Sequence, residues 1–305
     1  MEVFTAELSD MCRSKVSMRC LLKSALYCPL GILLLVLLPA ALLAQSSSRA
    51  PNSVKMPTLK SIDEYLLSYP SKYPEGDWEP AELPHQDVFF QSADGTQLHG
   101  WYCPAAKPRG FLLIAHGNAG HIAHRANWLR YLQRDLQLSV FAFDYRGYGR
   151  SRGTPSVQGA IDDSVAARAK LRELANIEDK DMILMGESLG GAMVIQLASQ
   201  SSPKALILQS TFPSLREVAA VHFPNLAWMV SRRKLVSADA ITKYQGPLLI
   251  SHGQEDRTIP HALGKKLFDN ANEPKQWVSI PGADHNNWLT EDYLKRLDQF
   301  LQKLP

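Results

Sequence analysis

The sequence predicts an α/β fold, in which helices cover both faces of a mostly parallel central sheet. After residue 85, short apolar runs alternate with longer amphipathic stretches, and this alternation is typical of strand–helix units in a doubly wound sheet. The short runs are apolar on both faces, as expected for strands buried in a mainly parallel sheet. The 305 residues are 45% hydrophobic and 21% charged, which is enough apolar material for a large core.

A hairpin is the first element expected in the sheet. Gln86–Gln91 and Thr96–Cys103 flank Ala93-Asp94-Gly95, and Asp-Gly is typical of a hairpin turn. The later strands are predicted at Phe111–Ala115, Val140–Phe143, Met182–Met185, Ala205–Leu208, Pro247–Ile250 and Trp277–Ile280.

Helices are predicted between these strands from the spacing of their apolar residues. In the last helix, Leu289, Tyr293, Leu297 and Leu301 recur at near-helical intervals. The expected helices are Ala123–Arg134, Val157–Leu174, Gly191–Ala198, Ala262–Asn270 and Trp288–Leu304.

An uncharged run of 25 residues, Ser24 to Ser48, precedes this pattern. It is long enough to cross a hydrocarbon core of about 30 Å as a helix. Four basic residues stand before it and two soon after, which favours a cytoplasmic N-terminus and an exported C-terminal domain. We expect a cytoplasmic segment at 1–23, a transmembrane signal anchor at 24–44, a tether and lead-in at 45–84, and the α/β domain at 85–305. The alternative is a cleaved signal peptide and a secreted protein, although Leu42 fits a cleavage site poorly.

Charge and cysteine content exclude several classes of protein. The net charge is only +3 and no basic stripe interleaved with aromatics occurs, so nucleic-acid binding is not expected. Cys12, Cys20, Cys28 and Cys103 form neither a disulfide framework nor a zinc cluster. The first two are either plain thiols or, if they face the cytoplasm, sites of lipidation.

Ser188 lies in the segment Gly186-Glu187-Ser188-Leu189-Gly190. A strand-like run enters this Gly-x-Ser-x-Gly motif and a helix-like run leaves it, which is the setting of a nucleophile elbow. The sharp turn exposes the serine hydroxyl at the positive end of a helix. A Ser/Gly turn without chemical consequence is the alternative.

A serine nucleophile needs a general base that is oriented by an acid. In proteins with this elbow the acid and then the histidine follow the serine in sequence. Asp256 and His285 follow Ser188 in that order, each just after a strand-like run. Glu255 is an alternative acid. Three other histidines and one aspartate are expected to be structural: His252 at a strand end, His222 and His261 as surface or cap residues, and Asp284 in a loop cap.

An oxyanion hole requires two backbone N–H donors aimed at the developing negative charge. One is expected from Leu189, directly after the nucleophile, and the other from the loop His116–Gly120 after an early strand, with Asn118 as the donor. A plain turn is the alternative for that loop. This chemistry requires no metal or organic cofactor.

The motifs together resemble one branch of the α/β-hydrolase superfamily. The segments His-Gly-Asn-Ala-Gly at 116–120, Phe143–Ser151 and Gly186–Gly190 carry the resemblance, which extends from about residue 85 to the C-terminus. That branch contains small, often membrane-tethered serine hydrolases related to the yeast bud-emergence hydrolase. The resemblance implies an α/β-hydrolase fold, favours Asp256 as the acid, and implies hydrolysis of carboxylic esters or thioesters. Dehalogenase and epoxide hydrolase chemistry is disfavoured because those relatives have an aspartate at the position of Ser188. We expect Asp144–Ser151 to be a structural loop.

A short insertion at about residues 212–239 is expected to form a small cap. Its apolar residues either line an acyl pocket or cover the sheet, and they are Phe223, Leu226, Trp228, Met229 and Val230. Arg232-Arg233-Lys234 is either a solvated charged face or a contact for anionic headgroups.

The sequence therefore predicts a serine hydrolase that forms an acyl-enzyme on Ser188, with a small-molecule or lipid-like ester as its substrate. The alternatives are an aminopeptidase-like amide hydrolase and a non-catalytic binding protein on the same fold.

Overall fold

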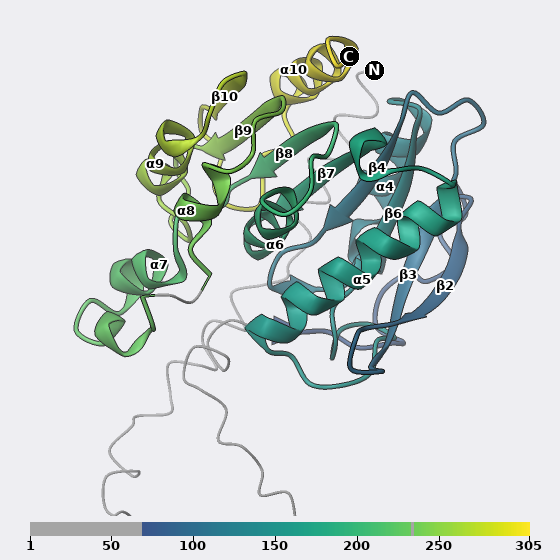
Figure 1. The fold of residues 1–305 in the computed structure, drawn as a ribbon, viewed down its shortest axis with the longest axis horizontal. Helices are drawn as coiled ribbons and strands as arrows, with labels where there is room; N and C mark the ends of the chain where they lie inside the picture. Colours follow the sequence, from purple (N-terminus) through teal and green to yellow (C-terminus); the bar gives the residue numbers. More distant parts are fainter. Residues whose placement is uncertain (1–68, 233–234) are drawn as a thin grey trace, which may run out of the picture. The chain divides into compact units, whose positions relative to one another are not determined.

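An eight-stranded sheet forms the centre of the computed structural model, which describes residues 69–232 and 235–305 (Figure 1). Its strand order is β10-β9-β8-β7-β4-β6-β3-β2. Neighbouring strands are parallel except that β3 is antiparallel to both β2 and β6. The predicted mostly parallel sheet is thus confirmed. The strands are β2 (Gln86–Gln91), β3 (Gln97–Cys103), β4 (Gly110–Ala115), β6 (Leu138–Asp144), β7 (Met182–Glu187), β8 (Ala205–Gln209), β9 (Leu248–Gly253) and β10 (Lys275–Ile280).

Helices cover both faces of the sheet. On one face, in front in Figure 1, α5 (Val157–Ala175) packs beside α6 (Leu189–Ala198). The row continues from α6 through α8 (Ser237–Ile241) to α9 (His261–Asn270).

The other face carries α4 (Ala126–Arg134) and α10 (Glu291–Gln302). Trp128 of α4 packs edge-on against Trp288, with ring centroids 5.6 Å apart. The last helix begins at Glu291 rather than at Trp288 because the Thr290 side chain accepts the N–H of Tyr293 and caps it.

The predicted hairpin is confirmed. β2 and β3 pair from Gln86↔Tyr102 to Gln91↔Gln97, and the N–H of Ser92 donates to the carbonyl of Thr96 at 2.9 Å. Gly95 adopts φ +82° in the turn, a left-handed conformation that glycine allows without steric cost.

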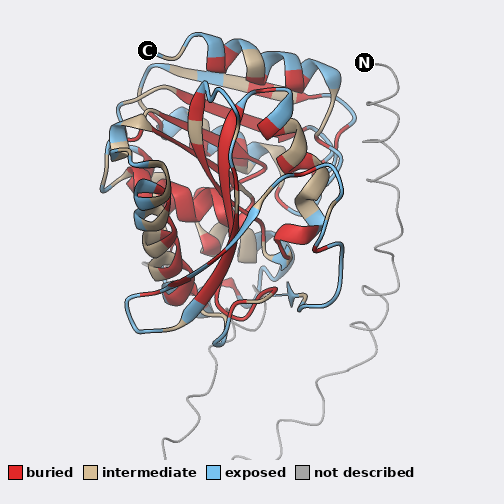
Figure 2. Cartoon of the chain, turned by 90° about the vertical axis from the view of Figure 1, so that its right-hand side faces the viewer, coloured by how far each residue is buried: buried red, intermediate tan, exposed pale blue. Residues whose placement is uncertain are grey.

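The core lies between the sheet and its helices, and Figure 2 shows the buried residues concentrated in the strands and the inward faces of the helices. Every residue of β6, β8 and β9 is buried. This burial on both faces explains why these strands appear in the sequence as continuous apolar runs rather than as alternating ones.

The residues just before the hairpin pack on this sheet domain. β1 (Tyr69–Pro70) pairs in parallel with β5 (Ala119–Gly120), and the N–H of Tyr69 donates to the carbonyl of Asn118 at 3.0 Å. Trp78 and Leu83 are buried. At least residues 69–84 of the predicted lead-in are therefore in contact with the domain.

The predicted anchor at 24–44 lies outside the described residues. In the part of the chain that the structure describes, no helix is long and apolar enough to cross a membrane. Cys103 lies in the described part and is buried, and burial raises the pKa of its thiol to about 12. Such a thiol is unreactive at neutral pH.

The loop Asp144–Ser151 is held by a buried arginine. Arg146 forms a 2.7 Å ion pair with Asp163 of α5 and a 2.8 Å pair with Asp94 of the hairpin turn. The hydrogen bonds that Arg146 donates to the Asp163 carboxylate raise the pKa of the guanidinium. The loop thus links the hairpin to α5, in agreement with the structural role predicted for it.

The insertion at 212–239 forms α7 (Leu215–His222), the short helix η4 (Ala227–Met229) and the start of α8. Of its five apolar residues named above, Val230 is buried in the core, whereas the other four are exposed. Those four side chains therefore lie outside the core.

Candidate active site

Ser188 occupies a strained turn between β7 and α6. Its backbone has φ +52° and ψ −114°, a combination that costs a residue with a side chain about 1–3 kcal/mol. A Cβ on Gly190 would lie 2.0 Å from the carbonyl oxygen of Ala115, so the motif requires glycine there. The turn is fixed from the neighbouring strand, because the Ser188 N–H donates to Gln209 O at 2.8 Å. This is the geometry of a nucleophile elbow.

Ser188, His285 and Asp256 are joined by two hydrogen bonds. The Ser188 hydroxyl lies 3.1 Å from His285 Nε2, and His285 Nδ1 lies 2.7 Å from Asp256 Oδ2. Asp256 comes from the loop after β9 and His285 from the loop after β10, so all three residues meet at the carboxyl edge of the sheet. With its Nδ1–H donated to the carboxylate, His285 presents the lone pair of Nε2 to the serine.

The Asp256 carboxylate is buried and fully hydrogen-bonded. Its Oδ1 accepts the N–H groups of Thr258 and Ile259 at 2.9 and 2.8 Å. Burial raises its pKa, but the hydrogen bonds from His252 and His285 outweigh burial and hold the pKa of Asp256 well below its usual range. Asp256 is therefore ionised at neutral pH.

His252 is a second histidine on this carboxylate, a role that the sequence did not reveal. Its Nε2 lies 2.7 Å from the carbonyl of Ile259 and 3.2 Å from Asp256 Oδ2. Both neighbours accept hydrogen bonds, so Nε2 must carry the proton. The four-residue spacing of His252 and Asp256 within one strand-to-loop segment is the signal that could have suggested this contact.

The loop at Asn118 lies against the nucleophile. A Cβ built on Gly117 would be 3.6 Å from Ser188 Cβ. The carbonyl of Asn118 is fixed by Tyr69 N–H at 3.0 Å and by the hydroxyl of Tyr148 at 2.8 Å. Leu189 is the first residue of α6, and the first N–H groups of a helix have no partner within it. Gly117, which precedes Asn118, and Leu189 thus both adjoin Ser188.

The other residues considered from the sequence are exposed or are bonded to other partners. Glu255 is exposed, whereas Asp284 accepts the N–H of Asn286 at 2.8 Å and caps its loop as expected. His222 is exposed and contacts the carbonyl of Thr258 at 2.7 Å. His261 bonds to the hydroxyl of Ser279 at 2.9 Å.

An ion pair beside the nucleophile was also missed from the sequence. Arg125 Nε donates to Glu187 Oε2 at 3.3 Å, and both side chains are largely buried. Arg125 NH1 also donates to the carbonyl of His121 at 3.2 Å. The pair therefore ties the residue before Ser188 to the segment that follows the Asn118 loop.

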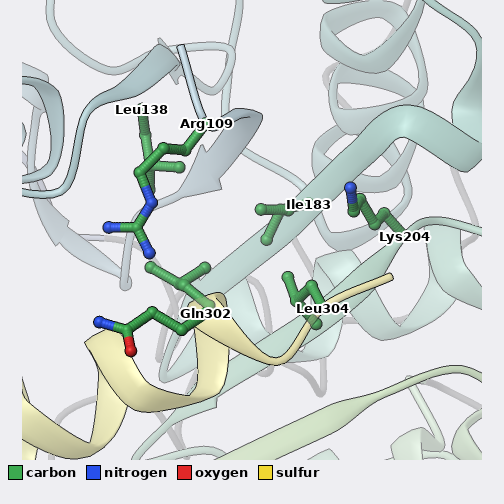
Figure 3. A pocket seen from close by; sticks show the side chains of 7 residues that line it. Arg109, Leu138, Ile183, Lys204, Gln302 and Leu304 are labelled. Carbon is green, nitrogen blue, oxygen red and sulfur yellow. The ribbon is translucent and has the colours of Figure 1, made fainter.

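The structure also contains a hollow of about 370 Å³ far from this chemistry (Figure 3). Arg109, Leu138, Ile183 and Lys204 line it at the amino ends of β4, β6, β7 and β8. Ser188 follows the carboxyl end of β7, so the hollow lies at the opposite edge of the sheet. Within residues 69–232 and 235–305, no group of three or more His, Cys, Asp or Glu side chains could hold a metal ion.

Sequence comparisons identify relatives of this chain. A family model described as "Serine aminopeptidase, S33" matches residues 106–240, a stretch that includes Ser188 and ends before Asp256. An uncharacterized protein of Mycobacterium tuberculosis is 38% identical over 228 residues, which cover 73% of this chain and 80% of the relative. The alpha/beta hydrolase domain-containing protein WAV2 of Arabidopsis thaliana is 35% identical over 245 residues, covering 72% and 80%.

Solved structures share the fold at low sequence identity. The Pyrococcus furiosus esterase Pf2001 aligns with TM-score 0.64 and 18% identity, over 78% of this chain and 98% of the esterase. Est1E from Butyrivibrio proteoclasticus, solved with ferulic acid bound, aligns with TM-score 0.57 and 20% identity, over 71% and 98%.

Proposed function

The chain belongs to the α/β-hydrolase family, and we propose that it is a serine hydrolase that cleaves carboxylic ester or thioester bonds. The observation that carries the proposal is the row of hydrogen bonds from Ser188 through His285 to Asp256, at 3.1 and 2.7 Å. A serine hydroxyl becomes an effective nucleophile when such a base and acid accompany it.

The proposed reaction proceeds in two steps. His285 Nε2 takes the hydroxyl proton while Ser188 Oγ attacks the substrate carbonyl, and Asp256 stabilises the imidazolium that forms. The Asn118 and Leu189 amides bind the oxyanion, and the loss of one such donor typically costs about 3–4 kcal/mol of transition-state stabilisation. His285 then protonates the leaving alcohol or thiol, and a water molecule that it deprotonates releases the acyl group. Side chains and backbone amides perform every step, so no cofactor is required.

An aminopeptidase is the second candidate, because the matching family model bears that description. An aminopeptidase must bind the ammonium group of its substrate, and Glu187 is the carboxylate adjacent to the nucleophile. Arg125 already neutralises Glu187 through their 3.3 Å contact. This pairing favours an uncharged acyl group over an N-terminal ammonium.

Two measurements test the proposal. A fluorophosphonate probe should label the wild-type chain and fail to label Ser188→Ala, and p-nitrophenyl esters of graded chain length should be hydrolysed faster than aminoacyl p-nitroanilides. Absence of labelling in folded wild-type protein would leave the non-catalytic alternative. Faster hydrolysis of the aminoacyl amides would favour the aminopeptidase.

We further propose that the chain belongs to the membrane-tethered branch related to the yeast bud-emergence hydrolase. In this proposal the protein is located at a membrane. Support comes from the uncharged run at 24–48 and the basic residues before it. Residues 24–44 would form a signal anchor, residues 1–23 would be cytoplasmic, and the hydrolase domain of 85–305 would be exported. Protease added outside intact cells should degrade the domain. Protection of the domain would place it inside, and its release into the medium would indicate signal cleavage.

A further inference from the structure

The cap exposes a cluster of large apolar side chains. Within nine residues, Val221, Phe223, Leu226, Trp228 and Met229 are 44%, 44%, 53%, 69% and 46% exposed; we call these five residues the cap surface. Apolar side chains scattered singly over a surface need no explanation, but a clustered patch marks an interaction site.

The cap surface is attached to the catalytic edge of the sheet. α7 follows the carboxyl end of β8. His222 lies between Val221 and Phe223 of the cap surface, and its Nε2 contacts the carbonyl of Thr258 at 2.7 Å. The N–H of Thr258 in turn donates to Asp256 Oδ1 at 2.9 Å. Two hydrogen bonds therefore connect the cap to the acid of the active site.

The N-terminal part of the chain joins the domain at this same edge. Tyr69 pairs with the strand after Asn118 and donates to the Asn118 carbonyl at 3.0 Å. The uncharged run of Ser24 to Ser48 precedes it, and the 20 residues from 49 to 68 can span at most about 70 Å. A membrane that holds the run would thus lie within reach of the catalytic edge.

The positive charges beside the cap surface favour contact with negatively charged membrane headgroups. Arg216 precedes the cluster in α7 and Arg232, which is exposed, follows it. The Glu217 carboxylate is paired with Lys266 at 2.5 Å, which neutralises it. Exposed aromatic and aliphatic side chains flanked by arginines are typical of segments that lie in the headgroup region of a membrane.

We propose that the cap surface docks on a phospholipid bilayer that contains anionic lipid. Trp228 and its neighbours enter the interface, and the carboxyl edge of the sheet, which carries Ser188, faces the membrane. As a consequence, which rests on the function proposed above, acyl esters partitioned into the bilayer reach Ser188 directly.

Trp228 provides the measurement, because each of the other five tryptophans lies in the described domain and is far less exposed. The full chain is reconstituted into vesicles of phosphatidylcholine and phosphatidylglycerol with brominated acyl chains, which quench tryptophan fluorescence on contact. We expect strong quenching that Trp228→Phe abolishes. The double variant Leu226→Ser with Met229→Ser should lower the docking equilibrium constant by at least about tenfold, since each change removes one large apolar contact.

A matched control places the reporter elsewhere. Phe89 on the edge strand β2 is 51% exposed and lies outside the cap, so Phe89→Trp combined with Trp228→Phe should show little quenching. Equal quenching at positions 89 and 228, or cap-dependent association with a second chain or another protein in place of lipid, would overturn the proposal. Turnover of a short, water-soluble ester by the same preparations separates the proposed hydrolase function from the proposed docking. No turnover by the wild-type protein would refute the hydrolase function. Turnover without quenching of Trp228 would refute only the docking.

Discussion

Asp256→Asn is the most informative substitution in this site, because it changes hydrogen bonding while preserving shape. The carboxylate accepts four hydrogen bonds: two from backbone amides on Oδ1, and two from His285 and His252 on Oδ2. An asparagine can keep its oxygen toward the two amides. Its NH₂ group must then face His285 Nδ1 and His252 Nε2. Both nitrogens carry protons in the wild-type protein and need a hydrogen-bond acceptor opposite them.

The expected loss of activity follows from this reversal. A donor facing His285 Nδ1 forces that nitrogen to accept, so the histidine proton moves to Nε2. Nε2 then cannot take the proton of Ser188, from which it is 3.1 Å distant. The same change of tautomer in a Ser-His-Asp protease lowers kcat by about 10⁴-fold, and we expect a decrease of about 10³–10⁴-fold for this chain.

The assay is kcat for a p-nitrophenyl ester, accompanied by thermal unfolding to show that the variant is folded. Glu255→Gln is the matched control, because Glu255 adjoins Asp256 but is exposed, and it should retain nearly full activity. If Asp256→Asn keeps more than about a tenth of wild-type kcat, or if Glu255→Gln carries the loss, then Asp256 is not the acid.

Three further predictions concern residues around the site. Burial, and next the charge of its histidine neighbour, lower the pKa of His121 to about 4. Between about pH 6.5 and about pH 4, His121 therefore binds a proton in the unfolded chain but not in the native protein. The free energy of unfolding should fall by up to about 3 kcal/mol as the pH decreases through this range. His121→Phe should remove this acid-dependent loss in urea titrations at several pH values, and an unchanged pH dependence would contradict the assignment. Arg146→Met leaves Asp163 buried and unpaired, so it should cost about 3–5 kcal/mol in urea unfolding; a loss under 1 kcal/mol would show that the pair is dispensable. Gly190→Ala should prevent soluble expression or fluorophosphonate labelling, because the new Cβ would lie 2.0 Å from a backbone oxygen. Gly110→Ala is the control and should be tolerated, because its Cβ would lie 3.1 Å from the end of a side chain. Similar behaviour of the two variants would argue against the close approach at Gly190.

The sheet was predictable from the sequence because each strand has its own apolar run. The hairpin at Ala93-Asp94-Gly95 and the order of strands and helices are confirmed, with small shifts at the ends. Helix α10 begins later than expected since the Thr290 cap decides its start. α7, α8, β1 and β5 were not foreseen, because elements of two to eight residues leave too little periodicity.

The site was predictable only at the level of residue order. Ser188, Asp256 and His285 were selected from motif and sequence position, and the structure brings them together. His252 and the Arg125–Glu187 pair were missed because their contacts depend on three-dimensional neighbours. The exposure of Trp228 likewise depends on whether another element covers η4, which no local pattern in the sequence encodes.

The pairing of Tyr69 with the Asn118 loop makes the start of the described domain a support of the proposed oxyanion hole. A pull on the incoming chain would be transmitted through the 3.0 Å bond to the loop that carries one of the proposed oxyanion donors. Shortened forms that begin just after Pro70 would keep Ser188, Asp256 and His285 but lose this brace. The position of such a truncation is therefore expected to change the turnover rate of the proposed reaction.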